Sequence, residues 1–119
     1  MGATKTDHFT DPQNELAVLA KALGHPARIA IIEYLLKVDS CICGDIVNEL
    51  PLAQPTVSQH LRELKVAGLI KGTVEGTSIC YCINEVGIEK IKGFFEHISD
   101  LLEKKRNNPL AGDFAEQCC

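Results

Sequence analysis

The chain lacks the features that mark several common protein classes. It contains no run of about eighteen apolar residues, as a transmembrane helix would need, and no secretory leader is visible. Its 119 residues carry a formal net charge of −4, whereas a protein that only coats nucleic acid is usually basic. Because neither a membrane-spanning run nor a leader is visible, we expect a cytoplasmic protein with no membrane partner. Any specific binding to nucleic acid must depend on the local charge of one face.

Signatures of catalysis are missing as well. We find no Ser/His/Asp set and no glycine loop of the kind that cradles phosphates. Thiol oxidoreductases usually carry Cys-x-x-Cys, whereas this chain carries Cys-x-Cys, at Cys41 and Cys43. The sequence therefore predicts a protein that is not an enzyme and has no obligatory cofactor, with a thiol oxidoreductase as an alternative.

Cysteine, in contrast, is abundant. Six cysteines in 119 residues would indicate disulfides in a small secreted protein, but without an export signal we expect free, chemically active thiols. The cysteines form three pairs in the sequence: Cys41 and Cys43, Cys80 and Cys82, and Cys118 and Cys119. Thiolates select soft ions over magnesium or calcium, so these pairs are the candidate ligands for a soft metal.

Hydrophobic periodicity predicts one mainly α-helical domain with a small β-hairpin. We expect a flexible arm over residues 1–13, a folded domain over 14–105 and a flexible tail over 106–119. Helices are predicted from about 14 to 23, from 26 onward, from 41 or 43 to 50 and from 55 to 67; strands follow at 69–74 and 77–84, and a last helix at 86–105. This order is that of a winged helix-turn-helix.

The segment that begins at Pro55 carries residue types that read DNA. Short polar side chains at the start of a recognition helix meet base edges in the major groove, and glutamine can bind adenine through two hydrogen bonds. The candidate DNA-binding residues are Thr56, Ser58, Gln59, His60, Arg62, Lys65, Lys71 and Thr77. The alternative is an ordinary amphipathic helix with its polar side chains in water, and His60 could equally be a half-buried core histidine.

The last predicted helix carries a long apolar stripe. Its apolar residues recur at steps of three and four, which makes a seam long enough to pair with another helix. The seam contains Ile91, Phe95, Ile98 and Leu102. We therefore expect a homodimer, the alternative being that the stripe only covers the domain's own core.

Several motifs resemble those of one known family. The runs Leu23-Gly24-His25-Pro26-Ala27-Arg28, Cys41-Ile42-Cys43-Gly44-Asp45 and Val57-Ser58-Gln59-His60-Leu61 are similar to the ArsR/SmtB bacterial repressors, and in particular to their arsenic-responsive branch. The resemblance covers about residues 14–104. It implies a homodimer that binds double-stranded operator DNA. It also implies that the first and last helices form the dimer interface, which adds Leu16 and Leu19 to the seam.

The resemblance further implies an inducer site at Cys41 and Cys43, where As(III) or Sb(III) would bind and release the operator. The best-known arsenic site of the family has another cysteine three residues after the second, and here that position is Ile46. The third ligand therefore stays open. Cys118 or Cys119 could supply it from the tail, whereas Cys80 and Cys82 are less favoured. Oxidants, persulfides, or cadmium, zinc or copper ions are alternative inducers, and a winged helix that contacts only proteins is a further alternative.

Helical geometry gives a hypothesis for the switch. Residues two apart on a helix point about 200° apart, so Cys41 and Cys43 could share an ion only if the first turn of their predicted helix unwinds. We expect this strain to pass through residues 51–54 into the recognition helix.

The other inner pair is expected on a strand. Cys80 and Cys82 would emerge on one face, roughly 7 Å apart at Cα, which suits a metal bridge between them better than a disulfide. We expect that face to be exposed on the wing, with Ile79, Tyr81 and Ile83 facing the core.

Overall fold

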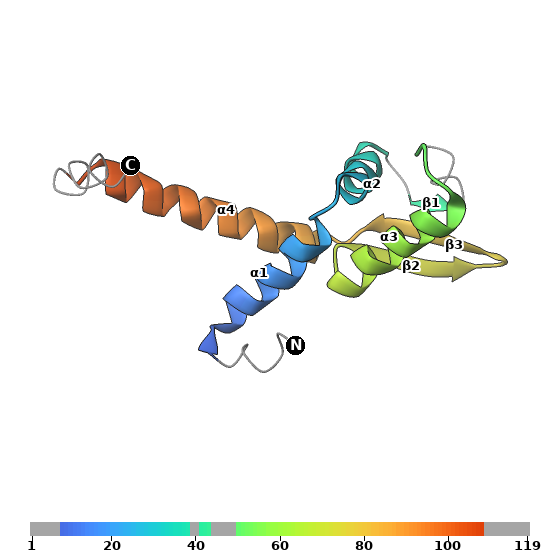
Figure 1. The fold of residues 1–119 in the computed structure, drawn as a ribbon, viewed down its shortest axis with the longest axis horizontal. Helices are drawn as coiled ribbons and strands as arrows, with labels where there is room; N and C mark the ends of the chain where they lie inside the picture. The colour runs from blue at the N-terminus through green and yellow to red at the C-terminus, as the bar shows by residue number, and fades with distance from the viewer. Residues whose placement is uncertain (1–7, 39–40, 44–49, 109–119) are drawn as a thin grey trace.

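The computed structural model describes residues 8–38, 41–43 and 50–108. These residues form helices α1 (Asp11–Ala22) and α2 (Pro26–Lys37), strand β1 (Ile42–Cys43), helix α3 (Gln54–Ala67), strands β2 (Ile70–Glu75) and β3 (Ser78–Ile83), and helix α4 (Glu85–Arg106). The helices α2 and α3 lie near the sheet, while α4 runs away from it as a long arm (Figure 1). Within the described ranges, no helix is both long and apolar enough to cross a membrane.

The predicted winged helix-turn-helix order is confirmed. Strands β2 and β3 form an antiparallel hairpin in which Ile70 pairs with Ile83 and Glu75 with Ser78. Gly76 lies between them with a φ of 62°, a conformation that glycine adopts at no steric cost. The strand order is β1-β3-β2, so β3 is the central strand and the wing is tied to the segment that follows α2.

One predicted element is wrong at its start. The helix expected to begin at Cys41 or Cys43 is replaced there by β1, which pairs antiparallel with β3. Ile42 lies opposite Tyr81 and Cys43 opposite Cys80, and this non-local backbone pairing overrides the local helical pattern. Residues 44–49 of the predicted helix lie outside the described residues.

The first helix begins earlier than predicted, at Asp11 rather than Asn14. Thr10 and Gln13 form a capping box, in which the Thr10 Oγ1 accepts from the Gln13 amide at 3.2 Å and the Gln13 Oε1 accepts from the Thr10 amide at 3.0 Å. These two bonds satisfy amides that would otherwise lack partners at a helix start.

The core lies where α1, α2 and α3 meet the sheet. Its most buried side chains are Ile31, Val57, Leu64, Leu69 and Ile70, with exposed fractions of 0 to 2 %. Leu19 belongs to the same core, with 4 % exposed. The domain's own core therefore accounts for the burial of Leu19, and its place in a dimer interface stays a prediction.

The predicted seam on α4 divides into two parts. Ile91 is partly buried and packs against the core. Farther along the helix, Phe95, Ile98, Leu101 and Leu102 are 40 to 62 % exposed. The domain's own core therefore accounts for the beginning of the stripe and leaves its second half in solvent.

The start of α4 is fixed to the corner between α3 and β2. The Asn84 amide donates to the Leu69 carbonyl at 3.0 Å, and the Asn84 Oδ1 caps α4 by accepting from the Val86 amide at 3.2 Å. Gly87 is buried, and a Cβ at this position would clash with the carbonyl oxygen of Gly68. The two backbones approach this closely because glycine has no side chain.

Candidate nucleic-acid interface and thiol cluster

Helix α3 has one buried side and one polar side. Val57, Leu61 and Leu64 are at most 3 % exposed and anchor the helix in the core. The exposed residues predicted for DNA binding on this helix are Thr56, Ser58, Gln59, Arg62 and Lys65. These five residues are thus exposed, as a recognition helix requires. Their contact with DNA stays a prediction.

Two further predicted residues extend the polar side of α3 onto the wing. Lys71 on β2 and Thr77 at the hairpin turn are both exposed. A Cβ at Gly72 would lie 3.4 Å from the Lys65 Nζ, so the Lys65 ammonium reaches over β2. Lys71 is the neighbouring residue on β2, so its side chain lies on the other face of the strand from the Lys65 ammonium.

His60 is the exception among the predicted DNA-binding residues. It is buried, with 6 % exposed, so the structure favours the core interpretation that the sequence left open. The Arg28 Nε donates to the His60 Nδ1 at 3.1 Å, and the Arg28 Nη1 donates to the Ala22 carbonyl at 3.4 Å. The His25 ring lies beside His60, with 4.4 Å between ring centroids. This cluster links the start of α2 to the middle of α3.

The surroundings of His60 lower its pKa below the ordinary value. Burial is the main cause, and the charges of His25 and Arg28 add to it. The hydrogen bond acts in the same direction, because a guanidinium can only donate and the His60 Nδ1 must therefore carry no proton. The folded state thus holds a neutral imidazole.

We expect this histidine to give the fold a pH dependence of known sign. Below about pH 6.5, the unfolded chain binds a proton at His60 that the folded chain excludes, so the free energy of unfolding falls as the pH drops. The fall ends once the pH passes the lower pKa of the folded state. His60→Gln is expected to remove this part of the slope in denaturant titrations between pH 7.5 and 5. His97→Gln, at an exposed position of α4, serves as the control that keeps it.

The inner cysteines meet across β1 and β3. Cys41 and Cys82 form a disulfide with 4.6 Å between their Cα atoms, within the usual range for such bonds. Cys80 is also disulfide-bonded. The prediction of free thiols is therefore wrong for Cys41, Cys80 and Cys82, because strand pairing brings together cysteines that are far apart in the sequence.

The predicted faces of β3 are correct only in part. Tyr81 and Ile83 pack against the core as expected. Ile79 is 45 % exposed, because it lies near the hairpin tip opposite Val74, beyond the reach of the core. Cys80 is 2 % exposed, so the expectation of an exposed Cys80 is wrong; β1 pairs beside it.

In the part of the chain that the structure describes, no group of three His, Cys, Asp or Glu side chains is placed to hold a metal ion. Cys118 and Cys119, the predicted tail ligands, lie outside the described residues. A cavity of about 390 Å³ adjoins the Cys41–Cys82 disulfide and is lined by Leu35, Leu36 and Glu85 among others.

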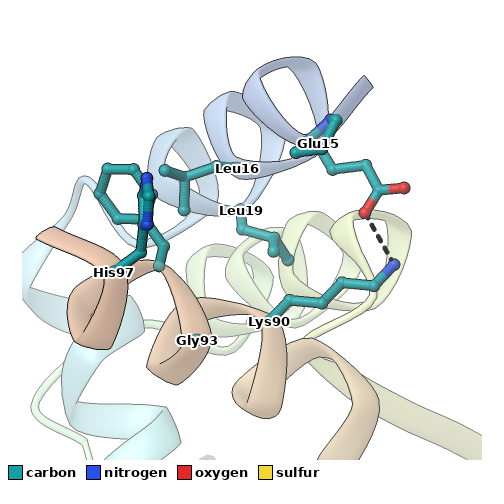
Figure 2. A pocket seen from close by; sticks show the side chains of 8 residues that line it. Glu15, Leu16, Leu19, Lys90, Gly93 and His97 are labelled. Carbon is teal, nitrogen blue, oxygen red and sulfur yellow. Dashed lines mark ion pairs between the residues drawn. The ribbon is translucent and has the colours of Figure 1, made fainter. Parts of the chain in front are cut away.

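A second cavity, of about 280 Å³, lies between α1 and α4. Leu16 and Leu19 point into it from α1, and Gly93 and His97 face them from α4 (Figure 2). At its rim the Lys90 Nζ lies 3.0 Å from the Glu15 Oε2; both side chains are about half exposed, so this pair contributes little to stability. Leu16, the other predicted dimer residue on α1, lines this cavity and is only partly buried by the rest of the chain.

Comparison with known proteins identifies the family. Residues 25–71 match the family described as bacterial regulatory protein, arsR family. The chain is 41% identical over 76 residues to an HTH-type transcriptional regulator of Methanocaldococcus jannaschii. These residues are 63% of this chain and 84% of that protein.

A second relative is the HTH-type transcriptional repressor SmtB of Mycobacterium tuberculosis. It is 41% identical over 63 residues, which are 53% of this chain and 46% of the repressor. An ArsR-like transcriptional regulator from Rhodococcus sp. RHA1 shares the fold, with a TM-score of 0.67 and 22% identity over 80% of this chain and 89% of that one. The chain therefore belongs to the arsR family of bacterial regulatory proteins, which are transcriptional regulators and not enzymes.

Proposed function

We propose that the chain is a transcriptional repressor that binds double-stranded operator DNA as a homodimer. A thiophilic inducer, in the first place As(III) or Sb(III), binds the thiolates of Cys41 and Cys43 and releases the DNA. The observation that carries this proposal is the exposed polar side of α3, held in place by its buried opposite side. The name of the related SmtB, a transcriptional repressor, supports the direction of regulation.

The charges near α3 suit a phosphate backbone. Arg62, Lys65 and Lys71 are exposed and can bind phosphates on either side of a groove, which fixes the protein on the duplex without reading its sequence. Ser58 and Gln59, near the start of the helix, can then reach base edges. The net charge of the chain is −4, the same sign as that of the DNA backbone, and it keeps non-specific binding weak.

The inducer part of the proposal depends on where the first cysteine pair lies. Because β1 pairs with β3, an ion at Cys41 and Cys43 acts on the wing through a hydrogen-bonded ladder, and no helix has to unwind. The same segment leads into α3 at Gln54. Both parts of the DNA-binding surface are therefore within reach of the inducer site.

The disulfide favours a second candidate function. Cys41 and Cys82 are bonded to each other, so the same repressor could respond to an oxidant through this pair. In that case a peroxide, and not arsenite, would change the affinity for the operator.

We expect arsenite to weaken operator binding of the reduced protein by at least about tenfold, the coupling expected of an inducer. Fluorescence anisotropy with duplex DNA from the chain's own promoter measures this, with arsenite, cadmium, zinc or peroxide added in turn. Cys41→Ser is expected to keep the affinity but lose the response. Gln59→Ala is expected to weaken binding about tenfold. Val66→Ala, 80 % exposed and two helical turns farther from the start of α3, is expected to leave it unchanged.

The outcomes separate the alternatives. Full induction in Cys41→Ser would reject the thiol site, and a response to peroxide alone would select the oxidant sensor. Absence of salt-dependent duplex binding would leave a winged helix that contacts only proteins.

A further inference from the structure

Two Cys-x-Cys segments face each other in the sheet. Cys43 is the backbone partner of Cys80, and Ile42 is the partner of Tyr81. Directly opposite residues of neighbouring strands lie on the same face of a sheet, and alternate residues of one strand share a face. The register therefore sets the backbone of Cys43 opposite that of Cys80, while Cys41 is bonded to Cys82, which shares a face of β3 with Cys80.

The Cys41 and Cys82 sulfur atoms are near enough to bind a common ion. They reach each other in a disulfide from Cα atoms 4.6 Å apart. Thiolates bind a soft ion at about 2.3 Å each, so two ligand sulfurs lie on the order of 4 Å apart. After reduction, a small rotation of either side chain is enough to reach that spacing. Cys41 is exposed and Cys82 is half-buried, so an ion can enter from solvent.

Cys80 is less well placed for a third ligand than Cys82. It is 2 % exposed, and its sulfur lies 3.1 Å from the Glu75 Oε2. Once Cys80 is reduced, its thiol can donate a hydrogen bond to this carboxylate, and the negative charge of the carboxylate works against a thiolate at that position. Cys82, in contrast, borders the cavity of about 390 Å³ that also reaches Cys41.

We propose that Cys82 supplies the sulfur that completes the inducer site of Cys41 and Cys43, so that the bound ion bridges β1 and β3. This inference rests on the proposed function for the identity of the ion as the inducer. Three sulfurs suit the pyramidal coordination of As(III). The tail cysteines Cys118 and Cys119 are then not needed as ligands.

Oxidation closes the same site. The Cys41 and Cys82 thiols form their disulfide by giving two protons and two electrons to a hydroperoxide, which leaves as an alcohol and water. The sulfurs of the disulfide are then no longer thiolates, which are the form that binds metals. Ion binding and this disulfide therefore exclude each other, and the full chain must be reduced before it can take up arsenite.

The bridge also explains how a bound ion would act on the wing, α3 and α4. β3 ends at Ile83, and Asn84 then caps α4 while its amide binds the Leu69 carbonyl at the end of α3. A pull on Cys82 is thus two residues from the corner at which the wing, α3 and α4 meet.

The test measures arsenite binding by the reduced full-length chain without DNA. Titration followed by the near-ultraviolet absorption of sulfur–arsenic bonds gives the affinity. Cys82→Ser is expected to lower it by at least about tenfold, since even changes outside the ligand shell cost a metal site this much. The matched control is the double variant Cys118→Ser, Cys119→Ser, which is expected to bind like the wild type.

Wild-type affinity in Cys82→Ser, or a loss of affinity confined to the tail variant, would overturn the proposal. A second measurement does not depend on the folding of any variant. Arsenite is expected to protect Cys82 of the wild-type chain from alkylation by N-ethylmaleimide, as read by peptide mass spectrometry, and unprotected Cys82 would equally overturn it. Both readouts are separate from operator release, so arsenite that binds through Cys82 but leaves the DNA bound would reject the proposed function and keep this site.

Discussion

Replacing Gly87 with alanine is expected to lower the free energy of unfolding by about 2 kcal/mol, the usual range for overpacking in a well-packed region. The added Cβ would clash with the Gly68 carbonyl oxygen and crowd the Leu69 Cα. These atoms belong to the backbone, so no side chain can rotate away to make room. The start of α4 must instead move off the corner between α3 and β2, which stretches the hydrogen bond from Asn84 to Leu69.

Gly93→Ala is the matched control on the same helix. A Cβ at Gly93 has no neighbour within 4 Å, so this change should raise stability by about 0.5–1 kcal/mol through the better helix propensity of alanine. Urea denaturation of both variants gives the two free energies. Opposite signs are the expected result, and a Gly87→Ala chain as stable as the wild type would contradict the close approach seen here.

Replacing Phe95 with aspartate is expected to convert the proposed homodimer into a monomer and to weaken operator binding by about 100-fold. Phe95 is 62 % exposed, so its loss leaves the fold of a single chain intact. A carboxylate in an apolar helix pair would have to be buried without a partner. The lost affinity follows because each half of the dimer raises the effective concentration of the other at the second half-site.

Lys104→Gln provides the control for the change in charge. It shifts the net charge by the same amount and, nine residues along α4 from Phe95, lies on the opposite side of the helix. Sedimentation velocity and operator anisotropy on both variants test the expectation. A Phe95→Asp chain that still sediments as a dimer, or a wild-type chain that sediments as a monomer, would reject the α4 seam.

Much of the fold follows from local sequence signals. The exposed polar positions of α3 other than His60 were predicted from the sequence, and the break between the strands expected at 69–74 and 77–84 located the hairpin. In these segments, local propensity and tertiary packing act in the same direction. The start of α1 was misplaced because the capping role of Thr10 depends on a reciprocal bond to Gln13.

The thiol cluster could not be predicted from local patterns. Residues 41–43 were expected to begin a helix, and only pairing with a strand nearly forty residues away makes them β1. One signal was present in the sequence, since Cys41-Ile42-Cys43 and Cys80-Tyr81-Cys82 have the same spacing. When two Cys-x-Cys segments lie on neighbouring strands, each cysteine of one can stand opposite a cysteine of the other. Local patterns in the sequence do not predict which strands are neighbours.

His60 shows a different limit. The sequence left it open between a DNA-binding residue and a half-buried core histidine, and the partner that decides the matter, Arg28, lies on another helix.

The contact of Gly87 with the end of α3 makes α4 a lever. The helix spans 22 residues, which is about 33 Å at the standard rise. A tilt of roughly 5° at its root would swing its far end by roughly 3 Å, more than the helix shifts of about 1–2 Å that commonly accompany switching at subunit interfaces. A small rotation at the start of α4 therefore becomes a larger displacement at its far end. In a twofold dimer, this displacement would change the distance between the two recognition helices.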